Sequence, residues 1–404
     1  MKALVFERSL PRYAAARVAS SWVPGGGARV GPLRLAQEED PALPGPEWRR
    51  VSPILAGICG SDLSTVDGRS SRYFEPIVSF PFVPGHEVVG RLIGGPDDGA
   101  RVVLEPVLGC AARGLEPPCA GCASGSTGAC ERVAFGHIKP GLQTGFCADT
   151  GGGWSTSLVA HPSQLHPVPD GLGDDHAVVV EPAACAVHAA LASGDVEGAT
   201  VAVVGAGTLG LLVVAALRHF CLPGAIIAAA KHPHQRRLAT ELGADHVVEP
   251  AGLARAVRRH TRAMAVGDGL SGGADVVLDC VGSADSIAEA LAVVRPRGRV
   301  VMVGMPGVTR VDLTPLWHRE TQLVGAYAYG VETPPGRPGP VRTFELAFEL
   351  VQEADLGRLV SARYPLDRYA DAIAHAGAAG RRGAVKVVFD LQHESRRPTW
   401  RTAS

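Results

Sequence analysis

The segment between residues 200 and 326 alternates apolar strand candidates with helical patterns, and this alternation constrains the fold more than any other feature. Strands rich in Val, Ile and Ala that are separated by helices predict a parallel, doubly wound sheet. The strand candidates are Thr200–Val204, Ala225–Ala229, His246–Val248, Ala274–Leu278, Arg299–Val303 and Gln322–Ala326. The main helical patterns are Leu209–Arg218, His234–Leu242, Leu253–Arg262 and Ser283–Val294.

A glycine-rich turn follows the first of these strands and opens the first helix. It has the spacing G-x-G-x-x-G, with glycines at Gly205, Gly207 and Gly210. These glycines allow a tight turn, approach of the backbone to a pyrophosphate, and close packing of helix on strand. The helix start at Thr208 and Leu209 then offers unpaired N–H groups to phosphates. The context predicts a dinucleotide site, with a glycine turn that binds no dinucleotide as the alternative.

The residues after the second strand bear on which dinucleotide is bound. An NAD-binding chain usually has Asp or Glu here to accept the ribose hydroxyls. This chain has Ala230, Lys231 and His232, with Arg236 and Arg237 about one turn later. The missing carboxylate and the added cations favour a 2′-phosphate, and so NADP, although NAD remains possible. The alternative interpretation is a solvated, basic helix start.

The first 170 residues have a different texture, with short strands separated by Gly- and Pro-rich loops. The strand candidates are Lys2–Phe6, Val51–Ala56, Glu87–Ile93 and Arg101–Leu104. A helical stretch at His176–Ser193 leads into the alternating region, and a further helix near Val341–Glu353 and a strand near Ala384–Phe389 follow it. The sequence therefore predicts a β-rich region joined to an α/β domain.

One loop of the β-rich region carries four cysteines. Cys110, Cys119, Cys122 and Cys130 have the spacing C-x8-C-x2-C-x7-C. Four thiolates in one loop suit a closed tetrahedral zinc site. Two disulfides are the alternative, but nine cysteines without a secretory signal favour a reducing, cytoplasmic compartment.

A second group of potential ligands is spread along the chain. Cys59 lies in a Gly-Ile-Cys-Gly-Ser-Asp motif, and His86 and Glu87 lie in a Pro-Gly-His-Glu-Val motif. A thiolate and an imidazole from separate loops are borderline-soft ligands that suit Zn²⁺. Either Glu87 or Glu181 could complete the site. Glu181 lies among Val and Ala residues, where a carboxylate must be paired, metal-bound or at an exposed turn.

Overall composition excludes some classes of partner. The formal net charge is −1, and 46% of the residues are hydrophobic, as in an ordinary globular protein. This balance gives no electrostatic reason to expect nucleic acid or a membrane surface as a partner. The apolar stretch from Val201 to Leu217 could suggest a membrane span, but its glycines and its strand-then-helix pattern argue against that.

With these motifs in this order, the chain resembles the zinc-containing members of the medium-chain dehydrogenase/reductase superfamily, in the style of sorbitol and threonine dehydrogenases. The matching motifs are Gly57–Asp62, Gly85–Gly90, Gly205–Gly210 and Arg299–Gly307. The resemblance implies an α/β fold with a GroES-like, β-rich catalytic domain and a doubly wound, parallel-sheet Rossmann coenzyme domain. The expected bounds are 1–180 and 327–390 for the catalytic domain, with a zinc lobe at 105–135, then 181–326 for the Rossmann domain and 391–404 for a polar tail.

The resemblance also implies two zinc ions per chain. Cys59 and His86 would bind a catalytic zinc, with Glu87 or Glu181 as a further ligand, and Asp62 would orient the imidazole. The four clustered cysteines would bind a structural zinc. The first cysteine gap is longer than usual in the family, and Glu116 stands where the shorter gap would place a ligand. Cys110 is preferred over Glu116, because four thiolates better satisfy a closed structural site.

The implied reaction is reversible hydride transfer between a small alcohol, or its carbonyl, and the nicotinamide. Ser61 matches the family's first proton-relay hydroxyl, with a turn serine as the alternative. Ser64 replaces the histidine that ends the relay in many relatives, and a serine cannot act as a base near pH 7. Relatives form dimers or tetramers, and the strand at Gln322–Gly330 could extend a sheet across a two-fold axis.

Two other functions fit parts of the pattern. A zinc-free quinone or enoyl reductase of the same superfamily would share the fold but would lack the Cys59/His86 pair and the cysteine lobe. A non-catalytic dinucleotide-binding protein would bind cofactor without turnover. Pocket walls are expected from the loop Thr65–Phe82 and from the surroundings of Trp154 and Trp317, with a core position of Trp154 as the alternative.

Overall fold

The computed structural model describes residues 1–392, which form two compact units. Unit 1 contains Met1–Glu181 and the chain from Asp355 onward, and unit 2 contains Pro182–Ala354. The polar tail expected at 391–404 lies outside the described residues, except for residues 391 and 392.

Residues 327–354 belong to unit 2, whereas the sequence analysis assigned them to the catalytic domain. Local contacts explain the difference. The backbone N–H of Thr343 donates to the Gly330 carbonyl at 2.9 Å, and His219 contacts Glu349 at 2.9 Å. The first bond lies within the segment, and the second joins the segment to His219 in the rest of unit 2.

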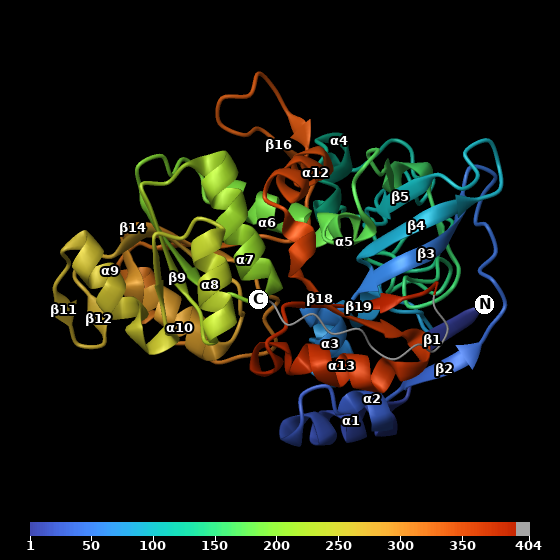
Figure 1. Ribbon diagram of the computed structural model, residues 1–404, viewed down its shortest axis with the longest axis horizontal. Coiled ribbons are helices and arrows are strands. Elements are labelled where there is room, and N and C mark those ends of the chain that lie inside the picture. The colour runs from blue at the N-terminus through green and yellow to red at the C-terminus, as the bar shows by residue number, and fades with distance from the viewer. Residues whose placement is uncertain (393–404) are drawn as a thin grey trace. The chain divides into compact units, whose positions relative to one another are not determined.

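Unit 2 is built on a six-stranded parallel sheet with the order β10-β9-β8-β13-β14-β15, which is the doubly wound order with a switch point beside β8 (Figure 1). The predicted doubly wound sheet is thus confirmed. The strands are β8 (Thr200–Val204), β9 (Ala225–Ala229), β10 (His246–Val248), β13 (Ala274–Asp279), β14 (Val294–Met302) and β15 (Gln322–Gly325). All of β8 except its first residue is buried, as expected of a strand covered on both faces.

Helices cover both faces of this sheet, and one shared core joins α9 and α10 to the strands. The helices are α6 (Val180–Leu191), α7 (Thr208–Ala216), α8 (Pro233–Glu241), α9 (Leu253–Thr261), α10 (Ala284–Val293), α11 (Thr314–His318) and α12 (Thr343–Glu353), with a π turn at Leu217–Cys221 and a 3-10 turn at Pro250–Gly252. Two small hairpins complete the unit, β11–β12 (Ala265–Val266, Gly269–Leu270) and β16–β17 (Val331–Glu332, Val341–Arg342).

Unit 1 contains a seven-stranded mixed sheet, with the order β18-β19-β3-β4-β5-β7 and with β6 also paired to β3. The strands are β3 (Arg49–Gly57), β4 (Val88–Ile93), β5 (Arg101–Leu104), β6 (Leu158–Ala160), β7 (Leu165–Pro167), β18 (Val360–Pro365) and β19 (Lys386–Asp390). A separate antiparallel pair joins β1 (Lys2–Phe6) to β2 (Leu33–Gln37). The last strand, β19, pairs with β3, so the C-terminal segment lies beside the strand that leads to Cys59.

Short helices connect these strands. They are α2 (Gly27–Val30), α3 (Gly60–Val66), α4 (Ala120–Ala123), α5 (Asp174–Ala177) and α13 (Tyr369–Gly377), with 3-10 turns at Arg72–Ile77, Thr127–Ala129, Pro162–Gln164, Leu356–Leu359, Leu366–Arg368 and Ala379–Arg382. The stretch predicted as one helix at His176–Ser193 is divided into α5 and α6.

A helix absent from the sequence prediction, α1 (Leu10–Trp22), lies between β1 and β2. Ser9 occupies its N-cap position and Pro11 its first turn, which are ordinary start signals. Asp67 fixes the end of this segment, because its buried carboxylate accepts from the N–H groups of Gly25 and Gly27 at 3.0 and 3.2 Å. The region predicted as strands and loops is therefore partly helical.

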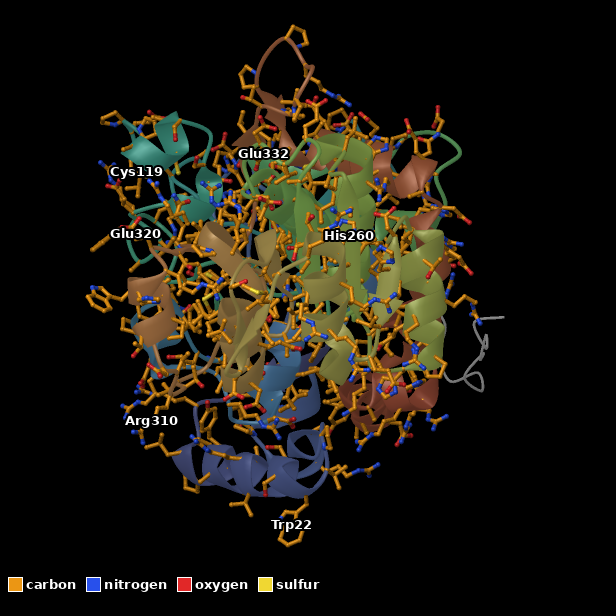
Figure 2. All side chains as sticks on the ribbon, turned by 90° about the vertical axis from the view of Figure 1, so that its left-hand side faces the viewer. Trp22, Cys119, His260, Arg310, Glu320 and Glu332 are labelled. Atoms are coloured by element: carbon orange, nitrogen blue, oxygen red, sulfur yellow. The ribbon has the colours of Figure 1, made fainter. Side chains whose placement is uncertain are left out.

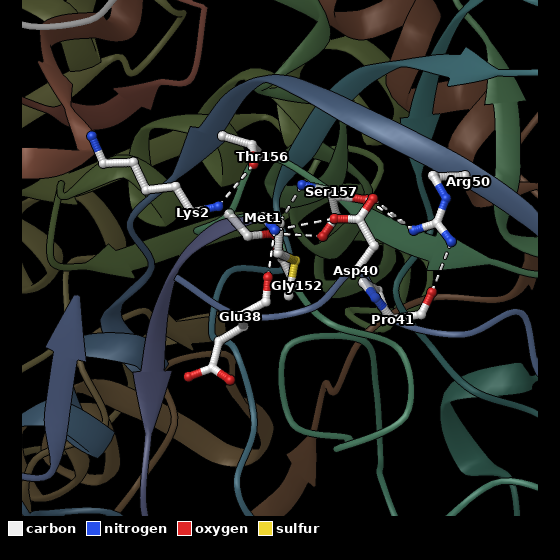
Figure 3. A network of polar contacts seen from close by, with 10 residues as sticks. Met1, Lys2, Glu38, Asp40, Pro41, Arg50, Gly152, Thr156 and Ser157 are labelled. Carbon is white, nitrogen blue, oxygen red and sulfur yellow. Dashed lines mark hydrogen bonds and ion pairs between the residues drawn. The ribbon is translucent and has the colours of Figure 1, made fainter. Parts of the chain in front are cut away.

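The start of the chain is tied to two loops of unit 1 (Figure 3). The Met1 ammonium pairs with Asp40 at 3.2 Å, and Arg50 contacts both Asp40 and Ser157. Burial favours a raised pKa for Asp40, but the Met1 ammonium outweighs it and lowers the pKa of that carboxyl. The N–H of Lys2 donates to the Thr156 hydroxyl at 3.1 Å, which anchors β1 beside the loop that carries Trp154.

Within residues 1–392, every helix is too short or too polar to traverse a bilayer.

Candidate metal centres and dinucleotide site

Cys59 lies at the end of β3 and at the N-cap of α3. The carboxylate of Asp62, one turn into the helix, accepts from the Cys59 N–H at 3.0 Å. This capping contact fixes the backbone of the cysteine and holds Asp62 at the helix start, where a negative charge is favoured. The cysteine is half-buried, and its sulfur is not in a disulfide.

His86 comes from the loop before β4 and is buried against Asp62. Its Nδ1 lies 3.4 Å from Asp62 Oδ1, which leaves Nε2 as the ring atom for a ligand. Burial lowers the pKa of His86, but the Asp62 carboxylate, with a contribution from Cys59, outweighs burial and raises the pKa well above its usual value. A metal ion would take the place of that proton, because a ligating imidazole must be deprotonated.

Glu87 points into the same region and forms an ion pair with Lys386 from β19. Both side chains are almost fully buried, and the Lys386 ammonium also donates to the Ile58 carbonyl at 3.3 Å. A Cβ on Gly57 would lie 1.8 Å from Glu87 Oε2, so only glycine fits beside the pair. The ion pair therefore explains the glycine that begins the Cys59 motif, two residues before Cys59.

Sequence reasoning missed Lys386, although a signal was available. Its neighbours in β19 are Val387, Val388 and Phe389, all buried, and a charged residue in such a strand needs a partner. The identity of the partner was not readable, because Glu87 lies far away in the sequence and the pairing of β19 with β3 brings the two together.

The structure brings three of the four predicted catalytic-zinc ligands together. One donor atom each from Cys59, His86 and Glu87 lies within 4.8 Å of the others, which fits a thiolate, imidazole and carboxylate set for zinc. Glu181 is buried at the start of α6 and is not part of this group. Its carboxylate is close enough to Lys386 to raise the pKa of that ammonium, alongside Glu87.

The four clustered cysteines form a second group of donors. Their sulfurs lie within 4.8 Å of one another, and all nine cysteines of the chain are free thiols. Backbone N–H groups of Cys110, Cys119 and Arg132 donate to sulfurs in the cluster at 3.4 Å. An N–H group that donates to a sulfur favours the thiolate form, which is the form that binds metal. Glu116, the alternative to Cys110, is exposed and outside the group.

The electrostatics of the cluster also fit a cation. Burial raises the pKa of Cys119, but N–H groups of Cys122 and Glu131 outweigh it and lower the pKa to about 6. Burial raises the pKa of Cys122 and of Cys130. Burial thus opposes the thiolate form of Cys122 and Cys130 beside Cys119, and a divalent cation is the charge that permits four adjacent thiolates.

Arg113 explains the long gap between the first two cysteines. Its fully buried guanidinium donates to the carbonyls of Leu108, Phe135 and Gly141 at 2.9, 2.8 and 2.6 Å. Burial lowers the pKa of Arg113, while the nearby thiols Cys147, Cys130 and Cys110 favour its charged form. The residues inserted between Cys110 and Cys119 thus supply a cation that holds the loop at 135–141.

Other residues singled out from the sequence take different positions. Ser61 lies in the first turn of α3, and Ser64 lies one turn later with its carbonyl accepting from Arg69 and Ser70. Trp154 is fully buried, donates to the Gly57 carbonyl at 3.1 Å and packs edge-on against Phe389, so the core interpretation is the correct one.

A cavity of about 530 Å³ lies beside the loop Thr65–Phe82. Its lining residues are Glu7, Arg8, Glu75, Val78, Phe80 and Pro81. Cys59, His86 and Glu87 are not among them, so this cavity does not contain the metal ligands.

The glycine-rich turn in unit 2 has the geometry of a phosphate-binding loop. Gly205 has φ +90, and a Cβ on Gly210 would lie 1.8 Å from the Gly205 carbonyl oxygen. Gly207 is the N-cap of α7, and a Cβ there would meet nothing within 4 Å. The turn is thus closed where helix and strand pack and open where a ligand would approach the first helical residues, Thr208 and Leu209.

The end of β9 carries cations and no carboxylate. Lys231 is exposed, and the Arg236 guanidinium lies over the strand end, 3.3 Å from the Ala230 carbonyl and 3.2 Å from that of Lys231. Arg236 also pairs with Glu249 at 3.2 Å. Arg237 points elsewhere and pairs with Glu241 at 3.5 Å.

Two family models match the chain in succession. Residues 45–170 match the alcohol dehydrogenase GroES-like domain, and residues 208–338 match the zinc-binding dehydrogenase model. The first match covers both cysteine sites and His86, and the second begins in the glycine-rich turn.

Curated relatives match most of the chain. A probable zinc-binding alcohol dehydrogenase of Mycobacterium tuberculosis is 30% identical over 91% of this chain and 88% of its own length. A sorbitol dehydrogenase of Arabidopsis thaliana is 28% identical over 86% of this chain and 89% of its own length. An L-idonate 5-dehydrogenase (NAD(P)(+)) of Escherichia coli is 27% identical over 85% of this chain and 93% of its own length.

Solved structures agree with this result. A protein from Sinorhizobium meliloti, described as a zinc-binding dehydrogenase and bound to NADP, is 26% identical with a TM-score of 0.68, over 89% of this chain and 95% of that one. The structure of the L-idonate 5-dehydrogenase of Escherichia coli is 25% identical with a TM-score of 0.67, over 89% of this chain and 94% of that one. With the two ligand groups and the glycine-rich turn in place, the chain belongs to the zinc-binding medium-chain dehydrogenases and is an oxidoreductase of the alcohol and polyol dehydrogenase type.

Proposed function

We propose that this enzyme binds a catalytic zinc through Cys59, His86 and Glu87 and interconverts a small polyol or secondary alcohol with its carbonyl, using NADP. The observation that carries the proposal is the convergence of the three donor atoms within 4.8 Å. A bound zinc would supply Lewis-acid polarisation of the substrate oxygen, and a bound nicotinamide would supply the two-electron exchange.

Asp62 has two tasks in this proposal. Its Oδ2 caps α3 at the Cys59 N–H, and its Oδ1 faces His86 Nδ1. One carboxylate therefore orients both the thiolate and the imidazole. It also keeps the imidazole proton on Nδ1, so that Nε2 presents its lone pair to the metal.

Glu87 and Glu181 have different roles in this proposal. Glu87 is the nearer carboxylate to Cys59 and His86, and Lys386 holds it in place. Glu181, at the start of α6, also interacts electrostatically with the Lys386 ammonium. We assign Glu87 as the ligand of the resting site and Glu181 as the carboxylate that can replace it.

The substrate proton would leave through Ser61, whose position in the first turn of α3 is two residues from Cys59. Ser64 cannot end the relay as a base, because a hydroxyl is not basic near neutral pH. The proton would therefore pass to water, to Glu87 or to a histidine elsewhere in the chain.

The preference for NADP is supported by the end of β9. A 2′-phosphate there would meet Lys231 and Arg236 and no carboxylate from this strand. Among the relatives, the Sinorhizobium meliloti structure is bound to NADP, and the idonate dehydrogenase is named for both cofactors. Arg236 would have to exchange its exposed partner Glu249 for the phosphate.

We assign a second, structural zinc to Cys110, Cys119, Cys122 and Cys130. Small polyols are the proposed substrates because the relatives are named sorbitol and idonate dehydrogenases. We further propose a homodimer or homotetramer, in which the edge strand β15 pairs with its counterpart in a second copy. Its outward residue Leu323 is 38% exposed, and edge strands present unpaired backbone groups.

The proposal is tested by turnover of the zinc-loaded enzyme with a panel of polyols, secondary alcohols and aldehydes, each with NADP(H) and NAD(H). We expect a lower KM for NADP than for NAD. In Arg236→Gln the KM for NADP should rise by about tenfold or more, because a charge-assisted phosphate contact is lost. Arg237→Gln is the matched control and should leave both KM values unchanged. Turnover with NAD alone would contradict the cofactor assignment, and no turnover with any substrate would contradict the enzymatic one.

A further inference from the structure

The net charge of −1 conceals a concentrated basic surface on α9. Successive residues of a helix turn by about 100°. The buried residues Leu253 and Val257 therefore define one face, and the four arginines around the helix lie within about 100° of one another on the opposite face. These arginines are Arg255, Arg258, Arg259 and Arg262.

None of these four guanidinium groups has an ion pair or hydrogen bond to any residue in 1–392. Two other exposed arginines of unit 2 do have acidic partners, because Arg237 pairs with Glu241 and Arg297 pairs with Glu320. Like charges three and four residues apart destabilise a helix. The helix dipole offsets this repulsion for the arginines in the last turn, because cations are favoured there, but it does not do so for Arg255 in the first turn. The chain thus maintains a cluster of like charge that it does not neutralise.

The segment that follows these arginines exposes two apolar side chains. The hairpin β11–β12 follows α9 directly, and Figure 1 shows α9, β11 and β12 side by side. Met264 and Val266 on this hairpin are 70% and 64% exposed. The acidic residue of its turn is Asp268, which is also exposed.

His260 is exposed near the end of α9, on the side of unit 2 that faces the viewer in Figure 2. Its ring lies 5.5 Å from that of His246 on β10. We call the four arginines together with Met264 and Val266 the α9 patch.

We propose that the α9 patch docks on an anionic phospholipid bilayer. Arginines beside exposed aliphatic side chains are the combination that binds the headgroup region, with the charges at the phosphates and the apolar side chains below them. The aliphatic hairpin favours a bilayer over nucleic acid, which is bound by cations and aromatic stacking and gains little from Met and Val. The net charge of −1 gave no reason to expect a membrane partner, because the positive charge of this patch is cancelled by acidic residues elsewhere in the chain.

The test is co-sedimentation of the full-length, zinc-loaded protein with vesicles of phosphatidylcholine alone or mixed with phosphatidylglycerol. Wild type should sediment with the anionic vesicles and not with the neutral ones, and the binding should weaken as salt is raised. Replacing all four patch arginines by Gln should weaken the binding by about a thousandfold, since each basic residue near the surface contributes. Met264→Ser with Val266→Ser should weaken it several-fold.

A charge-matched control separates the patch from net charge. Four exposed arginines elsewhere, Arg72, Arg297, Arg310 and Arg381, are replaced by Gln, which gives the same net charge as the patch variant. This control should bind vesicles as wild type does. The proposal is overturned if wild type ignores anionic vesicles, if the control loses as much binding as the patch variant, or if a DNA duplex binds the patch more tightly than the vesicles do. Binding is measured without turnover, so an inactive enzyme leaves the test intact.

Discussion

Lys386 and Glu87 form an ion pair whose side chains are only 2% and 1% exposed, beside the proposed catalytic zinc. Burial lowers the pKa of Lys386, but Glu87, followed by Cys59, outweighs it and raises the pKa, so the ammonium stays charged. The pair gives the carboxylate a fixed position and a counter-ion of its own. It also joins β19 to the two loops that carry the metal ligands.

Lys386→Met should therefore be strongly destabilising. Removing one partner of a buried pair leaves the other charge unpaired, which costs about 3–5 kcal/mol. The free energy of unfolding in urea measures this, and zinc content reports the local effect. Lys139→Met is the control, since Lys139 pairs with Asp149 at an exposed site and should change stability by less than about 1 kcal/mol. Equal losses in the two variants would refute the role given to Lys386.

Two glycines of one motif should respond oppositely to alanine. In Gly57→Ala the new Cβ would lie 1.8 Å from Glu87 Oε2 and 2.9 Å from Lys386 Cε, so the ion pair must move. We expect a loss of about 1–3 kcal/mol in stability and reduced zinc content. Gly60→Ala meets nothing within 4 Å at the start of α3 and should be neutral or slightly stabilising. Thermal unfolding of both variants measures the difference. A Gly57→Ala variant as stable as wild type would contradict the proposed clash with the Glu87–Lys386 ion pair.

The spacing of motifs was sufficient to single out the glycine-rich turn and the three residues that the structure brings together, Cys59, His86 and Glu87, because each lies in a short segment with its own local pattern. The same holds for β8 and β9, whose predicted bounds are those observed. Lys386 could not be assigned a role in this way, because its partner is set by the pairing of strands distant in sequence.

Helix α1 was missed for another reason. Its start signals at Ser9 and Pro11 were present, but its outward residues Leu10, Val18 and Trp22 are apolar and 65–83% exposed. The pattern of an ordinary surface helix, polar outside and apolar inside, is therefore blurred. Strand–helix alternation predicted a parallel, doubly wound sheet in unit 2, but not the order of its strands. The assignment of residues 327–354 needed contacts that the sequence pattern does not show.

The ligand of the cysteine lobe can be identified by substitution. Cys110→Ser should lower the zinc content by about one ion per chain, because one sulfur of the closed site is lost. Glu116→Gln should leave it unchanged, since Glu116 lies outside the cluster. Cys147→Ser controls for loss of a buried thiol, as Cys147 is fully buried but not among the four. Zinc loss in Glu116→Gln with none in Cys110→Ser would reverse the assignment.

Stability should fall under mildly acidic conditions because of His375. This residue is buried in α13, where Nδ1 lies 2.9 Å from the Tyr364 hydroxyl. Burial, aided by Arg382, lowers the pKa of His375 in the folded chain. His375 therefore binds a proton more tightly in the unfolded chain than in the folded chain. The resulting stability is fully present above about pH 6.5 and is lost as the pH falls through the lower folded value.

Urea unfolding between about pH 7.5 and pH 5 measures this dependence. His375→Gln should flatten the profile over this range, whereas His260→Gln, at an exposed position, should keep the slope of wild type. A profile in His375→Gln as steep as in wild type would mean that other groups carry the effect.

The most direct test of the account is the rate of alcohol oxidation by one preparation before zinc removal, after it and after zinc is restored. We predict two zinc ions per chain in the purified enzyme, loss of nearly all turnover in the metal-free protein, and recovery on re-addition of zinc in wild type but not in Cys59→Ser or His86→Ala. A metal-free protein that turns over as fast as the zinc-loaded enzyme would contradict a catalytic role for zinc at Cys59 and His86.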